Sequence, residues 1–398
     1  MNKIFQQYFI NAINQLKQEN RYREFVDIAR LCGEFPYAIN PQNNHKIVVW
    51  CSNDYLAMGQ HPDAINQAKI ALDSFGIGAG GTRNISGNNS MIINLERAVA
   101  SLHNKEKGLV FSSGYIANDG TIQAIAKIIP SLTIFSDQKN HASIIAGIKN
   151  SQAKKFVFRH NDLNHLEELL KNCDQNSPKL IVFESVYSMD GDFGKIAEIV
   201  EIAKKFNALT YIDEVHAVGL YGKTGAGLSE QLNLQNDIDI IQGTFAKGFG
   251  TVGGYIAGDE LLIDAIRSYA SPFIFSTAMP PAIASAIISN INYLKTHNQE
   301  RQKLFANVNK VKELLIKNNI NIFPNNSHII SIIIGDAKKS QMISKYLLEN
   351  HDIYVQHINY PTVSRGDERL RITPSCLHTD QMIEHLIFAL TQAIQKIF

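Results

Sequence analysis

Residues 238–254 read IDIIQGTFAKGFGTVGG, an apolar run followed by a lone lysine among glycines and small residues. The short β-branched run bounded by glycine predicts a buried strand of a parallel sheet that is covered on both faces. Such a strand delivers Lys247 to the crevice where open α/β sheets hold ligands. Desolvation there lowers the pKa of a lysine and frees the amine for Schiff-base chemistry. The alternative is a solvated loop lysine, because most lysines are exposed.

A second segment, ALTYIDEVHAVG at residues 208–219, has a strand pattern that runs into two acids and a histidine. A carboxylate at the end of a buried strand is costly unless it meets a cation. The ring nitrogen of pyridoxal phosphate is such a cation, since a facing carboxylate keeps it protonated and makes the ring a better electron sink. Asp213 is the candidate partner of that nitrogen, and His216 would reach the same pocket. Taken singly, a helix N-cap for Asp213 and a core position for His216 are equally consistent.

Polar residues follow two further predicted strands. The run LIVFESVYSMDGD at 180–192 opens into a turn whose mouth includes Ser188, and the run LTIFSD at 132–137 leads toward His141. An imidazole at the start of the helix expected from about Ala142 can lie flat on an aromatic ring, or it can cap that helix.

The segment SSGYIAN at residues 112–118 reads as a loop that enters a helix. Backbone N–H groups and the helix dipole near Gly114 and Tyr115 would suit a phosphate. Loops of small residues also begin helices that bind no anion, so this loop is weak evidence by itself.

The layout predicts an α/β protein with two domains, because 398 residues exceed one ordinary core. We expect an amino-terminal helical segment at 1–46, whose apolar stripe serves core packing or a dimer contact rather than a membrane. Alternating strands and amphipathic helices over 47–285 predict a large doubly wound, mostly parallel sheet. Strands expected at 328–335, 353–358 and 369–373 give the remainder, 286–398, the character of a smaller α+β domain.

Charge and cysteine content argue against several classes of protein. Lys and Arg number 38 and Asp and Glu 37, without the basic stripe that nucleic acid would require. The four cysteines lack CxxC spacing, which argues against a disulfide framework or a metal site. Since no apolar run reaches the ~18 residues of a membrane span and no signal-type core is seen, we expect a cytoplasmic enzyme without a membrane or nucleic-acid partner.

The order of these motifs resembles that of the α-oxoamine synthases, pyridoxal-phosphate enzymes of fold type I, over nearly the whole chain. The shared motifs are SGYxAN, NHAS, ESVYSMDGD, TYIDEVHAVGLYG, GTFAKGFG and FIFSTAMPP. The resemblance implies the same fold type, pyridoxal 5′-phosphate as cofactor, and a homodimer whose active sites lie at the subunit interface.

The resemblance also implies a role for each matching residue. Lys247 would hold the cofactor covalently and remove the α-proton of glycine, Asp213 would face the ring nitrogen, and His141 would stack on the ring. Ser188 and His216 would reach the cofactor's oxygen or the substrate. Phosphate contacts would come from Gly114, Tyr115 and Thr244, and from Ser276 and Thr277 across the dimer interface. Arg371 would grip the glycine carboxylate, for which its bidentate fork is suited; a surface salt bridge is the alternative.

Within the family, the chain is most similar to members that condense glycine with succinyl-CoA. The stretches that carry this similarity are RYR at 21–23, WCSNDYL at 50–56, GAGGTRNISG at 78–87 and YVQHINYPTV at 354–363. Residues matching the succinyl carboxylate site are Arg23, Thr82 and Asn84, and those matching the substrate and coenzyme A path are Asn53, Ile85, Ser136, Lys155 and Thr362. Without the resemblance, a surface arginine and a packed tight turn would be the better interpretations of Arg23 and the glycine-rich run.

Two alternatives stay open at this point. A sibling synthase with another acyl donor, such as 2-amino-3-ketobutyrate CoA ligase or 8-amino-7-oxononanoate synthase, would share most of these motifs. A non-catalytic scaffold subunit would keep the fold, but it would have no reason to retain Lys247, Asp213 and both histidines.

Overall fold

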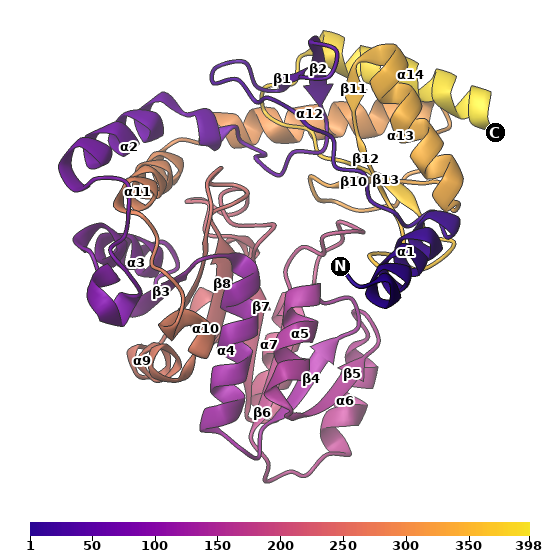
Figure 1. Cartoon of the computed structure of the whole chain (residues 1–398). Helices are drawn as coiled ribbons and strands as arrows, with labels where there is room; N and C mark the ends of the chain where they lie inside the picture. Colours follow the sequence, from indigo (N-terminus) through magenta and orange to yellow (C-terminus); the bar gives the residue numbers. More distant parts are fainter. The chain divides into compact units, whose positions relative to one another are not determined.

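The computed structural model describes residues 1–398 and divides into two compact units (Figure 1). The small unit comprises Met1–Ser52, Met189–Gly191 and Gln302–Phe398, and the large unit comprises Asn53–Ser188 and Asp192–Arg301. The expected boundaries at 46/47 and 285/286 therefore differ from this division. The amino-terminal segment groups with the carboxyl-terminal residues, and the helix Pro281–Thr296 packs on two helices of the large unit, Pro62–Phe75 and Ser90–Leu102.

The large unit is built on a seven-stranded sheet with the order β3-β9-β8-β7-β6-β4-β5. Only β9 runs antiparallel to its neighbours. The strands are β3 (Lys107–Phe111), β4 (Thr133–Asp137), β5 (Lys154–Phe158), β6 (Lys179–Glu184), β7 (Ala208–Asp213), β8 (Ile240–Thr244) and β9 (Gly254–Gly258). This confirms the predicted mostly parallel sheet, and the four strands predicted around its polar ends are present.

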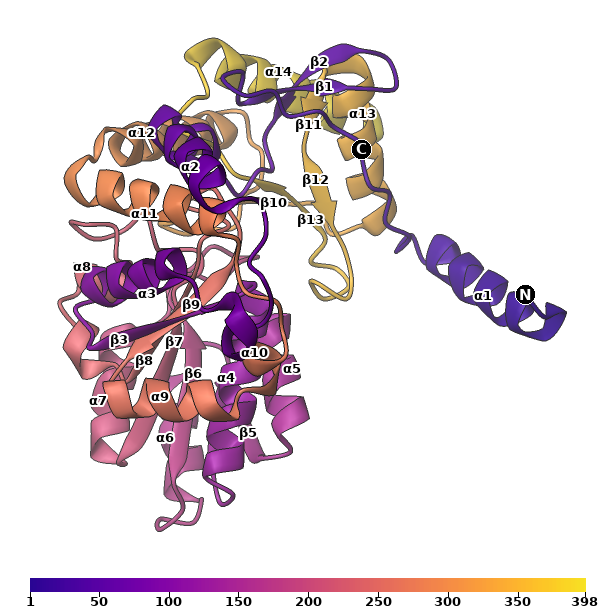
Figure 2. The same cartoon turned by 60° about the vertical axis from the view of Figure 1, so that its left-hand side comes forward.

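The large unit contains ten α-helices, several of which lie along this sheet, as Figure 2 shows. They are α2 (Pro62–Phe75), α3 (Ser90–Leu102), α4 (Gly114–Ile128), α5 (Ala142–Ser151), α6 (Leu163–Lys171), α7 (Ile196–Lys205), α8 (Leu228–Gln231), α9 (Glu260–Tyr269), α10 (Ser271–Ile274) and α11 (Pro281–Thr296). Helix α4 packs across β3, β8 and β9, and its apolar residues join those of the sheet in one buried cluster. Every residue of β4, β6 and β8 is buried, as expected for strands covered on both faces, and β6 contains the continuous apolar run LIVF at 180–183.

The small unit contains two three-stranded sheets, with the orders β1-β2-β11 and β10-β13-β12. Its strands are β1 (Tyr37–Asn40), β2 (His45–Val49), β10 (Ile330–Ile333), β11 (Ile353–Tyr354), β12 (Gln356–Ile358) and β13 (Arg369–Ile372). Its helices are α1 (Lys3–Gln18), α13 (Ala337–His351) and α14 (Asp380–Ile397), and α12 (Gln299–Lys317) crosses the division of the chain.

The single strand expected at 353–358 is two strands in different sheets. Ile353 and Tyr354 pair with β2, whereas Gln356–Ile358 pair with β13. Between them, Val355 is fully buried. The sequence of residues 353–358, IYVQHI, gives no sign that the chain changes from one sheet to the other at Val355.

Helix α1 forms as expected but has no buried residue. Ile4, Phe5, Tyr8 and Phe9 are each more than half exposed. Core packing within the chain is therefore wrong for this stripe, while a contact with a second subunit stays a prediction. No helix of the chain has the length and apolar character needed to cross a membrane.

Candidate active site

A cavity of about 150 Å³ in the large unit collects most of the residues predicted for cofactor chemistry. It is lined by Gly114, Tyr115, Asn118, His141, Ser143, Glu184, Asp213, Val215, His216, Thr244 and Lys247. They come from the carboxyl ends of the strands β6, β7 and β8 and from the start of α4 and α5. Since parallel strands end at one edge of a sheet, residues far apart in the sequence meet there.

Lys247 is the first member of a hydrogen-bonded chain of side chains. Its Nζ lies 2.7 Å from Nε2 of His216, whose Nδ1 lies 2.9 Å from the hydroxyl of Tyr55. The Tyr55 hydroxyl donates to Oδ1 of Asn53 at 3.1 Å. If each group donates in that same direction, His216 carries its proton on Nδ1 and accepts a hydrogen bond from the amine. Sequence reasoning had not singled out Tyr55, which nonetheless orients His216.

Asp213 ends β7 and is 4% exposed. Its Oδ1 accepts the backbone N–H of Val215 at 2.9 Å, and its Oδ2 accepts Nδ2 of Asn118 at 2.8 Å. The Asn118 amide is oriented by the Tyr211 hydroxyl, which donates to its Oδ1 at 2.7 Å. Each carboxylate oxygen therefore accepts one hydrogen bond, which fixes the orientation of the carboxyl group.

His141 stands at the N-cap of α5 and lines the cavity. Its Nδ1 accepts the backbone N–H of Ser143 at 3.2 Å and lies 2.7 Å from the Ser143 hydroxyl. Because Nδ1 accepts, the neutral ring carries its proton on Nε2. Burial, together with the positive charge of Lys247, lowers the pKa of His141 below its ordinary value, although Asp213 acts in the opposite direction. The capping contact is therefore confirmed, while stacking of His141 on a cofactor ring stays a prediction.

Glu184 ends β6 and is a buried acid at the same strand end as Ser188, with no role assigned to it from the sequence. One of its oxygens accepts the backbone N–H of His141. Burial, reinforced by the negative charge of Asp213, raises its pKa well above the ordinary value of a glutamate. Glu184 and Asp213, two neighbouring carboxyl groups at one edge of the sheet, therefore lie in different environments.

The start of α4 has the features of an anion site. Ser113 caps the helix by accepting the N–H of Ile116 at 3.2 Å, and Gly114 and Tyr115 line the cavity beside Thr244. A Cβ on Gly114 would meet Thr244 at 3.4 Å, so the absence of a side chain keeps this corner open. A helix N-terminus, a cavity-lining amine and a buried carboxylate in one cavity fit the phosphate, the aldehyde and the ring nitrogen of pyridoxal phosphate.

Other predicted residues of the large unit lie outside this cavity. Ser188 is half-buried in the turn between Val186 and Phe193, which form a β-bridge. Thr82 forms a bridge with Thr277, and Ser276 donates to the carbonyl of Pro272 at 2.6 Å.

The remaining three residues predicted along the coenzyme A path, and Asn84, differ widely in exposure. Ser136 is 3% exposed in β4 and accepts Nδ2 of Asn140 at 2.9 Å, whereas Lys155 is exposed on β5. Ile85 is 66% exposed, and the nearby Asn84 accepts the Thr82 hydroxyl at 2.8 Å.

The small unit brings together two residues that were predicted from opposite ends of the chain. Nη2 of Arg23 donates to the hydroxyl of Thr362 at 3.1 Å. Both line a cavity of about 320 Å³ whose walls are residues 21–26 and 354–362 of the same unit. Arg371, in contrast, is 7% exposed in β13, the central strand of its sheet.

The comparisons with known proteins agree with this geometry. Residues 45–390 match the family model described as aminotransferase class I and II. The chain is 54% identical to 5-aminolevulinate synthase of Rickettsia bellii over 96% of this chain and 92% of that protein. It is 49% identical to 5-aminolevulinate synthase of Bradyrhizobium diazoefficiens, over 99% and 97%. A solved serine palmitoyltransferase from S. paucimobilis with bound PLP superposes with a TM-score of 0.92 at 27% identity, covering 100% of this chain and 99% of that one.

The chain belongs to the aminotransferase class I and II family, with the fold of a pyridoxal-phosphate enzyme of fold type I. The high identity over nearly the full length then narrows the assignment. Within that family it is a member of the 5-aminolevulinate synthases. This membership removes the non-catalytic scaffold as an alternative.

Proposed function

We propose that this enzyme condenses glycine with succinyl-CoA to give 5-aminolevulinate, free coenzyme A and carbon dioxide, which supplies a precursor for heme and other tetrapyrroles. The observation that carries the proposal is the cavity in which Lys247, His216 and Asp213 meet, in a chain about half identical to named 5-aminolevulinate synthases. The chain's similarity to the serine palmitoyltransferase is much lower, at 27% identity.

Pyridoxal phosphate fits the donor set of this cavity. Asp213 would face the ring nitrogen, Lys247 would hold the aldehyde carbon, and Gly114, Tyr115 and Thr244 would contact the phosphate. His141 would lie on the ring, and Ser188 and His216 would reach the cofactor's oxygen or the substrate. When bound, the cofactor supplies a protonated ring that accepts electron density from the amino-acid α-carbon.

Lys247 is the proposed base for the α-proton of glycine. The contact between its Nζ and Nε2 of His216 at 2.7 Å places beside the amine a ring nitrogen that can share a proton taken up by Nζ. Tyr55 and Asn53 extend this chain and hold the His216 ring in one tautomer. The proton taken from glycine would therefore reside on Nζ, next to an acceptor that can share it.

Arg371 is the proposed partner of the glycine carboxylate. It is 7% exposed in β13, the middle strand of its sheet, so the backbone that carries the guanidinium is held in place. A planar fork that binds two carboxylate oxygens would also fix the rotation of glycine about its Cα–C bond.

The succinyl carboxylate is proposed to bind Arg23, Thr82 and Asn84, with the acyl and coenzyme A path formed by Ile85, Ser136, Lys155 and Thr362. Asn53 is proposed as a further substrate-binding residue. The contact between Arg23 and Thr362 supports this grouping, because it joins two of these residues across 339 positions of sequence. Both are exposed, so solvent or substrate can reach them.

A homodimer is proposed as the active form, with Ser276 and Thr277 completing the phosphate site of the partner subunit. The exposed apolar stripe of α1 supports an additional contact surface between subunits. We also propose a cytoplasmic location; the relatives that are 54% and 49% identical are bacterial 5-aminolevulinate synthases.

The decisive experiment compares acyl donors with the purified holoenzyme. Glycine is incubated separately with succinyl-, acetyl- and pimeloyl-coenzyme A, and release of free coenzyme A is measured together with the product by mass spectrometry. We expect 5-aminolevulinate from succinyl-CoA and much slower turnover of the other donors. Faster turnover of acetyl- or pimeloyl-CoA would instead identify a sibling synthase.

A further inference from the structure

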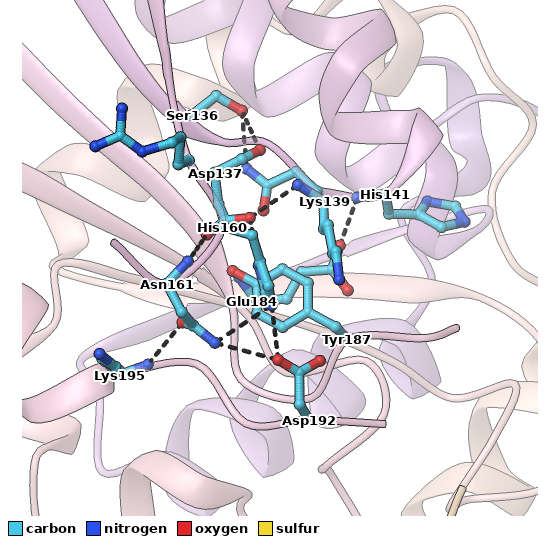
Figure 3. Close-up of polar contacts among 12 residues, drawn as sticks. Ser136, Asp137, Lys139, His141, His160, Asn161, Glu184, Tyr187, Asp192 and Lys195 are labelled. Atoms are coloured by element: carbon cyan, nitrogen blue, oxygen red, sulfur yellow. Dashed lines mark hydrogen bonds and ion pairs between the residues drawn. The ribbon is translucent and has the colours of Figure 1, made fainter. Parts of the chain in front are cut away.

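A histidine outside the cavity bridges two carboxylates at the same edge of the sheet (Figure 3). Nδ1 of His160 lies 2.8 Å from Oδ1 of Asp137, and Nε2 lies 2.6 Å from Oδ2 of Asp192. Asp137 ends β4, His160 follows β5, and Asp192 lies in the loop after β6. These three strands are neighbours in the sheet.

The two contacts require His160 to donate from both ring nitrogens, because ionised carboxylates only accept hydrogen bonds. A neutral imidazole has one N–H and can satisfy only one of them. Burial opposes the positive charge, but the hydrogen bonds and charges of Asp137 and Asp192 outweigh it and raise the pKa of His160 to about 9. The bridge therefore contains an imidazolium at neutral pH.

On one side, the bridge holds the turn that presents His141. Besides His160, the Asp137 carboxylate accepts the backbone N–H of Lys139 at 2.8 Å and that of Asn161 at 3.0 Å. Two residues after Lys139 comes His141, whose backbone N–H is held by Glu184. The orientation of the Asp137 carboxylate therefore positions the backbone between the end of β4 and His141.

On the other side, the bridge holds the loop that contains Ser188. Asp192 also accepts Nδ2 of Asn161 at 3.2 Å, and its carbonyl accepts the N–H of Tyr187 at 3.0 Å. The Tyr187 ring packs edge-on against His160 with ring centroids 4.4 Å apart. The loop's start and end are thus tied to the same imidazolium.

We propose that His160 is a positioning residue, whose doubly hydrogen-bonded imidazolium fixes the His141 turn and the Ser188 loop for cofactor binding. This inference rests on the proposed function, because it assigns the two loops to the pyridoxal-phosphate site. His160 itself does not line the cavity and is not assigned any contact with the cofactor or substrate.

The first test measures cofactor affinity directly. Apoprotein of the wild type and of His160→Gln is titrated with pyridoxal phosphate, following visible absorbance and circular dichroism, with far-UV spectra to establish folding. We expect binding weaker by about tenfold and an altered visible dichroism for His160→Gln. His45→Gln is the matched control, because His45 also contacts an aspartate, Asp352, at 3.2 Å but is 61% exposed in the small unit.

An unchanged dissociation constant, within about twofold, and an unchanged visible spectrum in folded His160→Gln would overturn the proposal. Should that variant fail to fold, Asp192→Asn replaces it, since it leaves the contact between His160 and Asp137 in place. The dissociation constant and the visible spectrum of Asp192→Asn are then judged by the same criteria.

The second test follows the protonation of His160 in the apoprotein by nuclear magnetic resonance of its imidazole. The titratable groups that face it are Asp137 from β4 and Asp192 and Tyr187 from the loop after β6. Because the folded pKa exceeds the ordinary value of 6.5, the bridge's stabilisation is complete below that pH and is lost as pH rises through about 9. Titration near 6.5 would overturn the imidazolium assignment.

These readouts separate this inference from the proposed function. A wild-type protein that binds pyridoxal phosphate but makes no 5-aminolevulinate would defeat the proposed reaction and leave the His160 bridge standing. If the wild-type protein makes 5-aminolevulinate and His160→Gln binds the cofactor as tightly as the wild type, the proposed reaction stands. The proposal for His160 is then overturned.

Discussion

The cavity of the large unit and the Arg23 cavity of the small unit differ in how firmly their polar groups are held. Asp213 is 4% exposed and accepts hydrogen bonds on both oxygens, and Lys247, His216 and Tyr55 form a continuous chain. Arg23 and Thr362 are exposed. The groups proposed for bond making sit on strand ends, whereas those proposed for acyl recognition sit on irregular segments.

This difference separates reaction chemistry from donor selection. Side chains at the ends of buried strands have fixed backbones and pre-arranged partners, which suits proton transfer and electrostatic stabilisation. Side chains on exposed segments can change without disturbing a core, which suits selection among acyl groups. Variants in the first region should therefore lose turnover with every donor, and variants in the second should change the ranking of donors.

Replacement of Lys247 should have the largest effect. Lys247→Ala removes both the covalent attachment of the cofactor and the proposed base, and we expect turnover to fall by about 10³-fold or more with every acyl donor. Borohydride reduction followed by mass spectrometry should show cofactor covalently attached to the wild type and not to the variant. Lys223→Ala, at an exposed lysine of the same unit, serves as control. A Lys247→Ala protein with full activity would remove the basis of the comparison.

Replacement of Asp213 should act through the cofactor's electronics. Asp213→Ala leaves the ring nitrogen without its anion, and we expect turnover to fall by roughly 10²-fold, equivalent to about 2.7 kcal/mol of barrier. Cofactor affinity, measured by titration of the apoprotein, should fall as well. Asp237→Ala, which removes an exposed partner of Lys204, is the control. Near-normal rates with Asp213→Ala would mean that the acid has been assigned to the wrong atom of the cofactor.

The strand ends were the predictable part of this site. Asp213 and Lys247 follow apolar runs that are buried in the structure, so their position at the sheet edge followed from the pattern of the residues before them. The resemblance to α-oxoamine synthases added roles, but the meeting of Lys247, Asp213 and His216 in one cavity also follows from the sheet topology.

The supporting residues were not predictable from local sequence. Asn118 lies inside α4, where a polar residue ordinarily faces solvent, yet it is 1% exposed and holds Asp213. Tyr55 meets His216 across 161 positions, and His160 joins carboxylates from two other loops. Such contacts depend on the tertiary arrangement, and a single sequence without its fold carries no periodic signal for them.

Replacement of Arg23 should sharpen the contrast between the two cavities. If Arg23 binds the distal carboxylate of the succinyl group, Arg23→Leu should reduce kcat/KM for succinyl-CoA by roughly 10- to 100-fold. Butyryl- and acetyl-CoA, which carry no such carboxylate, should be turned over as before or faster, and the KM for glycine should stay the same. Arg30→Leu, at an exposed arginine of the same unit, is the control. Equal losses for charged and uncharged donors would show that Arg23 has a structural role.

The smallest expected effect belongs to Tyr55, which contacts His216 in the hydrogen-bonded chain that begins at Lys247. Tyr55→Phe keeps the buried ring but removes the hydroxyl that meets Nδ1 of His216 at 2.9 Å, which leaves that nitrogen without this partner. A neutral hydrogen bond of this kind contributes about 0.5–1.5 kcal/mol, so we expect kcat to fall by roughly 2- to 10-fold. The loss should be equal for succinyl- and acetyl-CoA, because Tyr55 acts through His216 and not through the acyl group.

The pH midpoint of the cofactor's visible absorbance should also shift in Tyr55→Phe, since His216 can change tautomer once its partner is gone. Tyr22→Phe, at an exposed tyrosine that lines the Arg23 cavity of the small unit, provides the matched comparison and should leave that midpoint unchanged. A donor-selective loss in Tyr55→Phe would contradict the separation of chemistry from donor selection, because it would place acyl recognition within the rigid cavity.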